Sequence, residues 1–151
     1  MLAYEISNYA RPGEESRHNL AYWRYQDYAG IGPGAHGRVT VDGRLRATRR
    51  HRAPEPWAER VEQSGHGTTD DTPVGPEERA REALLMGLRL SEGIAFGHFE
   101  ARTGMNLFDA IDGQVLGQAL AENYLRQTET HLIATAEGRK RLDALLPELA
   151  R

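Results

Sequence analysis

The sequence predicts an α/β protein in which a strand-rich first part is followed by a mostly α-helical, winged-helix-like part. Residues 38–41 and 44–48 alternate in polarity around Asp42-Gly43, the strongest hairpin signal in the chain. Residues 76–90 place their small and apolar side chains on one helical face. The elements expected after residue 93 follow the order helix, helix, short strand, short strand, helix, which is typical of a winged helix.

The composition is that of a soluble globular protein, and the length suits either one domain or a remnant plus a small domain. The 151 residues are enough for a core of useful size, and 39% hydrophobic with 27% charged residues is ordinary for this class. No apolar run approaches the ~20 residues that span a bilayer, and no basic-then-apolar leader precedes the first motif, so we expect a cytoplasmic protein. The chain has no cysteine, which excludes disulfides, thiolate metal sites and a self-contained iron–sulfur cluster.

The first part begins with a short aliphatic and aromatic run at residues 2–6, which predicts a strand that ends at polar turn residues. Residues 18–28 are rich in Tyr and Trp, and their spacing suits either a short helix or an irregular aromatic loop. Residues 28–32 predict a buried strand before a Pro-Gly turn. After the hairpin, two prolines precede a short helix expected at residues 57–63.

The second part is introduced by residues 64–75, whose Gly, Ser, Thr, Asp and Pro predict a surface loop and a domain boundary. The helix of residues 76–90 then begins with Pro and has acids in its first turn. Further elements follow in order: a short helix and turn at 94–104, a helix at 108–124, and strands at 125–127 and 130–134. Thr135 can cap a last helix, which Pro147 should kink or end.

The net charge of −3 argues against nucleic-acid binding. Residues 107–151 contain five basic and seven acidic residues, whereas a DNA-reading winged helix concentrates positive charge on its groove-facing element. DNA binding is therefore weakly supported.

Five motifs stand out in the chain: YEISNYARPG at residues 4–13, HNxxYW at 18–23, GIGxGAH at 30–36, LLMGLRLxxGI at 84–94 and TxEGRxxL at 135–142. Together they resemble the C-terminal portion of HemW-type proteins, which are radical-SAM relatives of oxygen-independent coproporphyrinogen III oxidase. The resemblance covers essentially the whole chain.

The resemblance implies a parent protein with an N-terminal radical-SAM partial TIM-type barrel, whose cysteine triplet binds a [4Fe-4S] cluster and S-adenosylmethionine. Residues 1–63 would be the C-terminal end of this barrel with its closing hairpin, residues 64–75 a linker, and residues 76–151 a HemN-type C-terminal domain. Because the cluster ligands are absent, we expect the chain to be catalytically inactive alone, with no catalytic residue of its own, and to act with that N-terminal half.

Two functions follow from the resemblance. The HemW branch resembles a haem-binding chaperone, which would bind and transfer haem. Other family members resemble enzymes that oxidatively decarboxylate coproporphyrinogen III. A winged-helix binding module is a weaker third hypothesis.

The HNxxYW motif is the one that implies haem binding. His18 is the candidate axial ligand of the haem iron, and Tyr22 and Trp23 could form a flat wall beside the porphyrin, with Asn19 completing the motif. The alternative is that His18 and Asn19 satisfy buried backbone groups at a barrel edge.

Two further groups of residues are candidates for contacting cofactor or substrate. Ile31, Gly32, Gly34 and His36 lie at a glycine-rich strand end, which in barrels faces the cavity, although tight barrel closure needs the same small residues. Residues 38–52 contain six arginines and one aspartate. Arginine forks bind carboxylates, so Arg38, Arg46 and Arg49 could steer tetrapyrrole propionates; a solvated hairpin, or one paired with acidic groups of the N-terminal half, is the alternative.

Two positions depart from the family pattern. Ser16 stands where the family commonly has Cys, and Gly37 stands where it commonly has Ser. The barrel remnant would also leave unpaired strand edges, which predicts a homodimer or strand exchange through residues 2–48.

Overall fold

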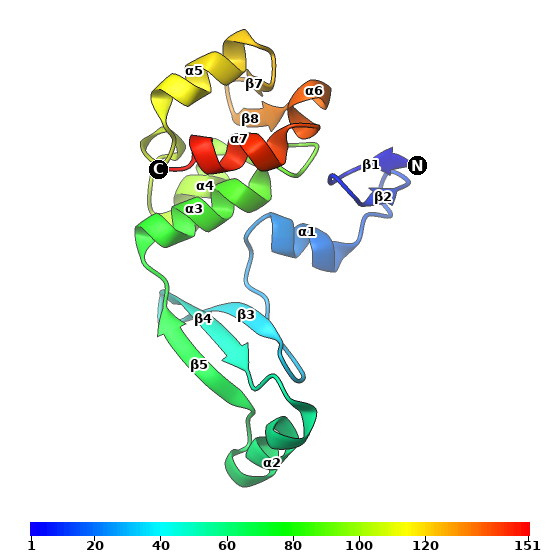
Figure 1. Cartoon of the computed structure of the whole chain (residues 1–151), viewed down its shortest axis with the longest axis vertical. Coiled ribbons are helices and arrows are strands. Elements are labelled where there is room, and N and C mark those ends of the chain that lie inside the picture. Colours follow the sequence, from blue (N-terminus) through cyan, green and yellow to red (C-terminus); the bar gives the residue numbers. More distant parts are fainter. The chain divides into compact units, whose positions relative to one another are not determined.

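The computed structural model describes all residues, 1–151. The chain forms two compact units, one of residues 1–25 with 76–151 and the other of residues 26–75. The chain thus leaves the first unit, builds the second, and returns (Figure 1).

The unit of residues 26–75 is built on an antiparallel sheet of order β3-β4-β5, drawn from cyan to green in Figure 1. β3 (His36–Val41) and β4 (Arg44–Arg50) form the predicted hairpin. Asp42 and Gly43 both have positive φ, as a two-residue type I′ turn requires. α2 (Pro54–Ser64) follows β4 and has Pro in its first turn. Proline is tolerated there because a backbone N–H at that position has no acceptor within the helix.

β5 (Thr68–Pro73) forms where the sequence predicted a surface loop, so the prediction was wrong for these residues. The strand pairs with β4 at the edge of the sheet, where Asp and Pro are tolerated because one row of backbone groups faces away from the ladder. Arg46 Nε of β4 donates to Asp71 Oδ1 of β5 at 2.6 Å. The proposed division into residues 1–63, 64–75 and 76–151 stays a prediction.

Residues 28–32 do not form the predicted buried strand. Tyr28 makes an isolated antiparallel bridge with Arg38, and its N–H donates to the Arg38 carbonyl at 2.7 Å. The chain then turns at Gly32, whose φ of 95° is unfavourable for other residues, and Ile31 is 88% exposed.

The unit of residues 1–25 and 76–151 is mainly helical. α3 (Pro76–Gly87) begins as predicted and packs on α4 (Phe96–Thr103). η1 (Leu107–Asp109) and α5 (Gly113–Ala121) replace the single helix predicted at residues 108–124, because the Asp112 carboxylate accepts from the N–H groups of Gln114 and Val115 and starts α5 there. The core consists of aliphatic side chains and Phe99.

A small sheet of order β6-β8-β7 belongs to the same unit. β7 (Leu125–Gln127) and β8 (His131–Ala134) confirm the two predicted short strands, and β6 (Ile94–Ala95) pairs with β8. Leu132, at the centre of this sheet, is fully buried.

The last predicted helix is divided in two. Thr135 caps α6 (Ala136–Arg139) as predicted, because its Oγ1 accepts from the Gly138 N–H at 3.0 Å. α7 (Leu142–Leu149) contains Pro147 and continues past it, so of the two expected effects, a kink or an end, the helix does not end at Pro147 itself. The proline lies two residues from the end of α7, where its missing N–H removes one hydrogen bond from the final turn.

The N-terminal segment consists of β1 (Leu2–Ala3), β2 (Tyr9–Ala10) and α1 (Arg17–Trp23). β1 is shorter than the strand predicted at residues 2–6, and the aromatic stretch that suited a helix or a loop forms a helix. Tyr25 is buried, and its hydroxyl donates to Glu82 Oε2 of α3 at 2.6 Å, which fastens the end of the segment to α3. None of the helices combines the length and apolar composition that crossing a bilayer needs.

Candidate functional site

Helix α1 carries the four residues of the predicted haem-binding motif. Ser16 caps it, because the Ser16 Oγ accepts from the Asn19 N–H at 3.3 Å. Side chains four residues apart share a helical face, so His18 lies with Tyr22, and Asn19 lies with Trp23. The motif therefore has two sides with different surroundings.

The side of Asn19 faces the N-terminal segment. Asn19 Nδ2 donates to the Tyr4 hydroxyl at 3.1 Å and to Asn8 Oδ1 at 3.2 Å. Asn8 Nδ2 in turn donates to Glu5 Oε2 at 2.6 Å. Asn19 thus links α1 to a buried carboxylate through one intermediate amide.

Glu5 is the centre of this hydrogen-bond network, and its side chain is fully buried. The N–H and hydroxyl of Ser7 donate to Oε2 at 3.0 and 3.1 Å, and Arg89 Nε donates to Oε1 at 2.8 Å. Burial alone would raise the pKa of Glu5, but the hydrogen bonds from Ser7, Asn8 and Arg89 outweigh it and hold this pKa below its ordinary value of 4.5. Glu5 is therefore ionised at neutral pH.

Arg89 also contacts Trp23, the second residue on the Asn19 side of α1. Its guanidinium lies 4.8 Å from the centroid of the Trp23 ring, a cation–π contact, while Tyr22 meets the same ring edge-on at a centroid distance of 4.9 Å. Trp23 is thus held between Arg89 and Tyr22. This leaves less of its ring free to form the porphyrin wall that the sequence suggested.

The side of His18 is different. His18 is exposed and makes no hydrogen bond or ion pair. The structure therefore gives no support to the alternative in which its imidazole satisfies buried backbone groups. α1 holds Asn19 and Trp23 in the network and leaves His18 available to a ligand.

Sequence reasoning missed Glu5 and Arg89, which organise this region. One signal was present: Glu5 stands inside an otherwise aliphatic and aromatic run, just before Ser7 and Asn8. A carboxylate in such a run is buried with partners or ends the run. Arg89 gave no comparable signal, because its pairing with Glu5 spans 84 positions of sequence.

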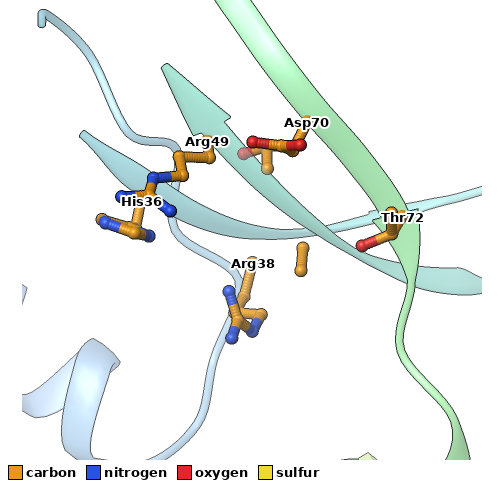
Figure 2. A pocket seen from close by; sticks show the side chains of 7 residues that line it. His36, Arg38, Arg49, Asp70 and Thr72 are labelled. Atoms are coloured by element: carbon orange, nitrogen blue, oxygen red, sulfur yellow. The ribbon is translucent and has the colours of Figure 1, made fainter. Parts of the chain in front are cut away.

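In the other unit, a pocket of about 340 Å³ opens on one face of the sheet β3-β4-β5. His36 and Arg38 of β3 line it together with Arg49 of β4, and the register places His36 opposite Arg49 and Arg49 opposite Asp70. Figure 2 shows these side chains on the same face, with their nitrogen atoms gathered near β3. Three residues predicted to meet a ligand are therefore close together.

Arg46 does not join them. It lies three positions before Arg49 on the same strand, so the two side chains point to opposite faces. On that face Arg46 pairs with Asp71. Its Nε donates to the Asp71 carboxylate, and its Nη2 donates to the Asp71 backbone carbonyl at 2.9 Å.

The glycine-rich turn of residues 30–34 forms part of a smaller pocket of about 210 Å³. Ile31 and Gly32 line it beside Trp57, whereas Gly34 does not. Gly30 is required for close packing, because an added Cβ would collide with the backbone of His36.

The two departures from the family pattern both have local structural roles. Ser16 is the cap of α1, a position that a hydroxyl suits. Gly37 is buried, and an added Cβ would lie 2.6 Å from Thr48 Oγ1 and 2.9 Å from the Gly30 nitrogen. A larger residue at position 37 would therefore force β3, β4 or the glycine turn to move.

The residues present restrict which cofactors the chain itself could hold. Without cysteine it offers no thiolate for an iron–sulfur cluster, and nowhere do three His, Asp or Glu side chains gather as a bare metal ion would need. Haem is a different case, since one exposed imidazole can be an axial ligand, and His18 fits that requirement.

The chain is similar to known proteins over most of its length. The model of the HemN C-terminal domain family matches residues 74–140. The heme chaperone HemW of Escherichia coli (strain K12) is 37% identical over 144 residues, which cover 95% of this chain and 36% of that protein. The mitochondrial radical S-adenosyl methionine domain-containing protein 1 of Mus musculus is 37% identical over 149 residues, which cover 95% of this chain and 34% of that protein.

One solved structure shares the fold. The coproporphyrinogen III oxidase HemN from Escherichia coli, described as a radical SAM enzyme, aligns with a TM-score of 0.60 and 15% identity over 91% of this chain and 34% of that one. The chain spans about a third of the length of these relatives. Family model, relatives and fold agree with the five motifs, and the chain corresponds to a C-terminal portion of a HemW-type protein.

Proposed function

We propose that this chain is the haem-binding part of a HemW-type protein that binds haem and transfers it to acceptor proteins. The observation that carries the proposal is His18, an exposed and unpartnered imidazole on a helix whose neighbouring side is fixed by Asn19 and Trp23. The relatives named heme chaperone HemW, from Escherichia coli and Bacillus subtilis, support it.

His18 would ligate the haem iron, and Tyr22, one turn further along α1, would lie against the porphyrin. A single exposed ligand suits transfer, because an acceptor can approach the iron without unfolding the carrier. Asn19 and Trp23 then act as positioning residues, since their contacts keep α1 in place while His18 binds.

A titration with haem tests this proposal. The wild-type chain should shift the Soret band on binding, and His18→Ala should lose that shift. His66→Ala is the matched control, because His66 is also exposed and lies in the other unit, on the segment that precedes β5. An unchanged Soret shift in His18→Ala, or equal losses in both variants, would remove His18 as the ligand.

An enzymatic role of the whole protein is the second candidate. The fold shared with HemN favours it, and the whole protein would then decarboxylate coproporphyrinogen III with a [4Fe-4S] cluster and S-adenosylmethionine. The ligands of that cluster would lie outside the residues described here, since these include no cysteine. The test is the full-length protein with a reconstituted cluster: cleavage of S-adenosylmethionine without decarboxylated product counts against this role.

We further propose that residues 1–63 complete a radical-SAM barrel and that residues 76–151 form a winged-helix-like domain. The order β6-β8-β7 supports the second part, because β6 lies between two helices and the hairpin β7–β8 follows a third. The N-terminal half of the parent protein would then be the partner of this chain, and a tetrapyrrole its ligand.

A further inference from the structure

The pocket on the sheet β3-β4-β5 has no part in haem ligation by His18, yet it gathers basic side chains. Cross-strand pairing builds it: His36, Arg49 and Asp70 form one row across the three strands, and Arg38 lies in the next row beside Ala47. All of these residues belong to the unit of residues 26–75. The pocket is therefore complete within one unit.

Its charge favours an anion. The Arg49 side chain makes no hydrogen bond or ion pair, although Asp70 is its register partner. Asp70, the only acidic residue that lines the pocket, accepts instead from the Thr69 hydroxyl at 3.2 Å. The ionisable side chains that line the pocket are thus two guanidinium groups, one imidazole and a single carboxylate.

The shape and the chemistry of the walls favour a carboxylate on an aliphatic arm. Guanidinium groups bind carboxylates with two parallel hydrogen bonds. Ala47 and Thr72 also line the pocket, and the Ala47 methyl group offers apolar contact to the carbon atoms that precede such a carboxylate. At about 340 Å³ the pocket lies at the small end of the roughly 300–1,000 Å³ typical of ligand sites, which suits one arm better than a whole macrocycle.

We propose that this pocket binds a propionate arm of a tetrapyrrole. The proposal rests on the proposed function for the identity of the ligand, but it uses residues of its own. Arg49 supplies the free guanidinium, Arg38 the second one, and His36 a further N–H donor. Because the site is open to solvent, its affinity should fall as salt screens the charges.

Metal-free coproporphyrin, which carries four propionates and no iron, is the probe, and the full 151-residue chain is the protein. Arg49→Gln should weaken its binding about tenfold, the value of one charge-assisted hydrogen-bonded contact. Arg44→Gln is the matched control: Arg44 is an exposed arginine of the same strand, without a partner and on the opposite face. It should leave the affinity within about twofold, a change comparable to that of a typical surface substitution.

The outcomes separate this site from His18. His18→Ala should not change coproporphyrin binding, because the probe has no iron to ligate. Equal effects of Arg49→Gln and Arg44→Gln, or no binding of the probe, would overturn the pocket while leaving the haem titration valid. If His18→Ala leaves the Soret shift with haem unchanged while Arg49→Gln still weakens coproporphyrin binding, haem ligation by His18 is overturned and the pocket stands. Inorganic phosphate that displaces the probe more effectively than succinate would overturn the assignment to a carboxylate.

Discussion

Glu5 shows how one residue can hold a segment of chain in place. A buried ionised carboxylate is stable only when other groups replace the water it has lost, and Ser7, Asn8 and Arg89 do so here. The same groups connect Glu5 to Asn19 and Trp23 on α1. The stability of the N-terminal segment and the position of α1 therefore depend on one carboxylate.

Replacing Glu5 should destabilise the chain strongly. Glu5→Gln leaves Arg89 without its buried counter-charge, so we expect the free energy of unfolding to fall by about 3 kcal/mol in urea denaturation. Glu92→Gln is the control, because Glu92 pairs with Arg24 at 2.7 Å in an exposed position and should contribute less than about 1 kcal/mol. Equal losses in the two variants would contradict the role of burial.

The same carboxylate should make stability depend on pH. The pKa of Glu5 is lower in the folded chain than its ordinary value of 4.5, so the unfolded chain binds the proton more tightly. The contribution of Glu5 is complete above pH 4.5 and is lost as the pH falls through the lower, folded pKa. Urea denaturation of the wild type and Glu5→Gln from pH 7 downward should show their difference shrinking below pH 4.5; a constant difference would refute this.

Ser16 should stabilise α1 through its hydroxyl. Ser16→Ala removes the acceptor of the Asn19 N–H, and we expect a loss of about 1 kcal/mol, a typical value for an N-cap. Ser64→Ala is the control, since Ser64 ends α2, is exposed and makes no side-chain hydrogen bond. If chemical denaturation gives the same small change for both, the cap has no energetic role.

Among whole elements, two helices carry glycines with opposite requirements. Gly117 lies inside α5 with open space around it, so Gly117→Ala should stabilise the chain by about 0.5–1 kcal/mol. Gly138 lies in α6 against the Tyr124 carbonyl, and Gly138→Ala would collide with it. Thermal unfolding should show a higher midpoint for Gly117→Ala and a lower one for Gly138→Ala. A shift in the same direction for both would show that packing does not determine the sign of the change.

Elements with strong local signals were predictable, whereas those that depend on distant partners were not. The Asp42-Gly43 hairpin, the start of α3 at Pro76 and the cap at Thr135 are local in sequence and are confirmed. β5 has a polar composition without alternation, and it becomes a strand because β4 offers a free edge. No property of residues 68–73 alone contains that information.

The candidate site was predictable to a similar degree. The two-residue period of a strand places His36 and Arg38 on one face, and the same rule separates Arg46 from Arg49, so that division could have been found. The register that brings Arg49 beside His36 follows from the hairpin turn. The network around Glu5 could not be found, because Arg89 lies just beyond the end of α3, 84 positions further along the chain.

For the whole molecule, the prediction of a homodimer through residues 2–48 remains to be tested. Leu2 and Tyr9 of β1 and β2 are 69% and 59% exposed, and the two strands form a sheet of their own, so both are edge strands. Sedimentation velocity should show a dimer at micromolar concentration, and the double variant Leu2→Lys, Tyr9→Lys should be a monomer. A monomeric wild type would contradict the prediction.

The return of the chain to its first unit also sets an order for folding during synthesis. Residues 26–75 are continuous, so they can fold as soon as they leave the ribosome, whereas Glu5 waits for Arg89, 84 positions later. Closing so long a loop is slow and entropically unfavourable. Until Arg89 has been made, Glu5 lacks its counter-charge, so the speed of translation between residues 26 and 89 determines how long residues 1–25 wait for the rest of their unit.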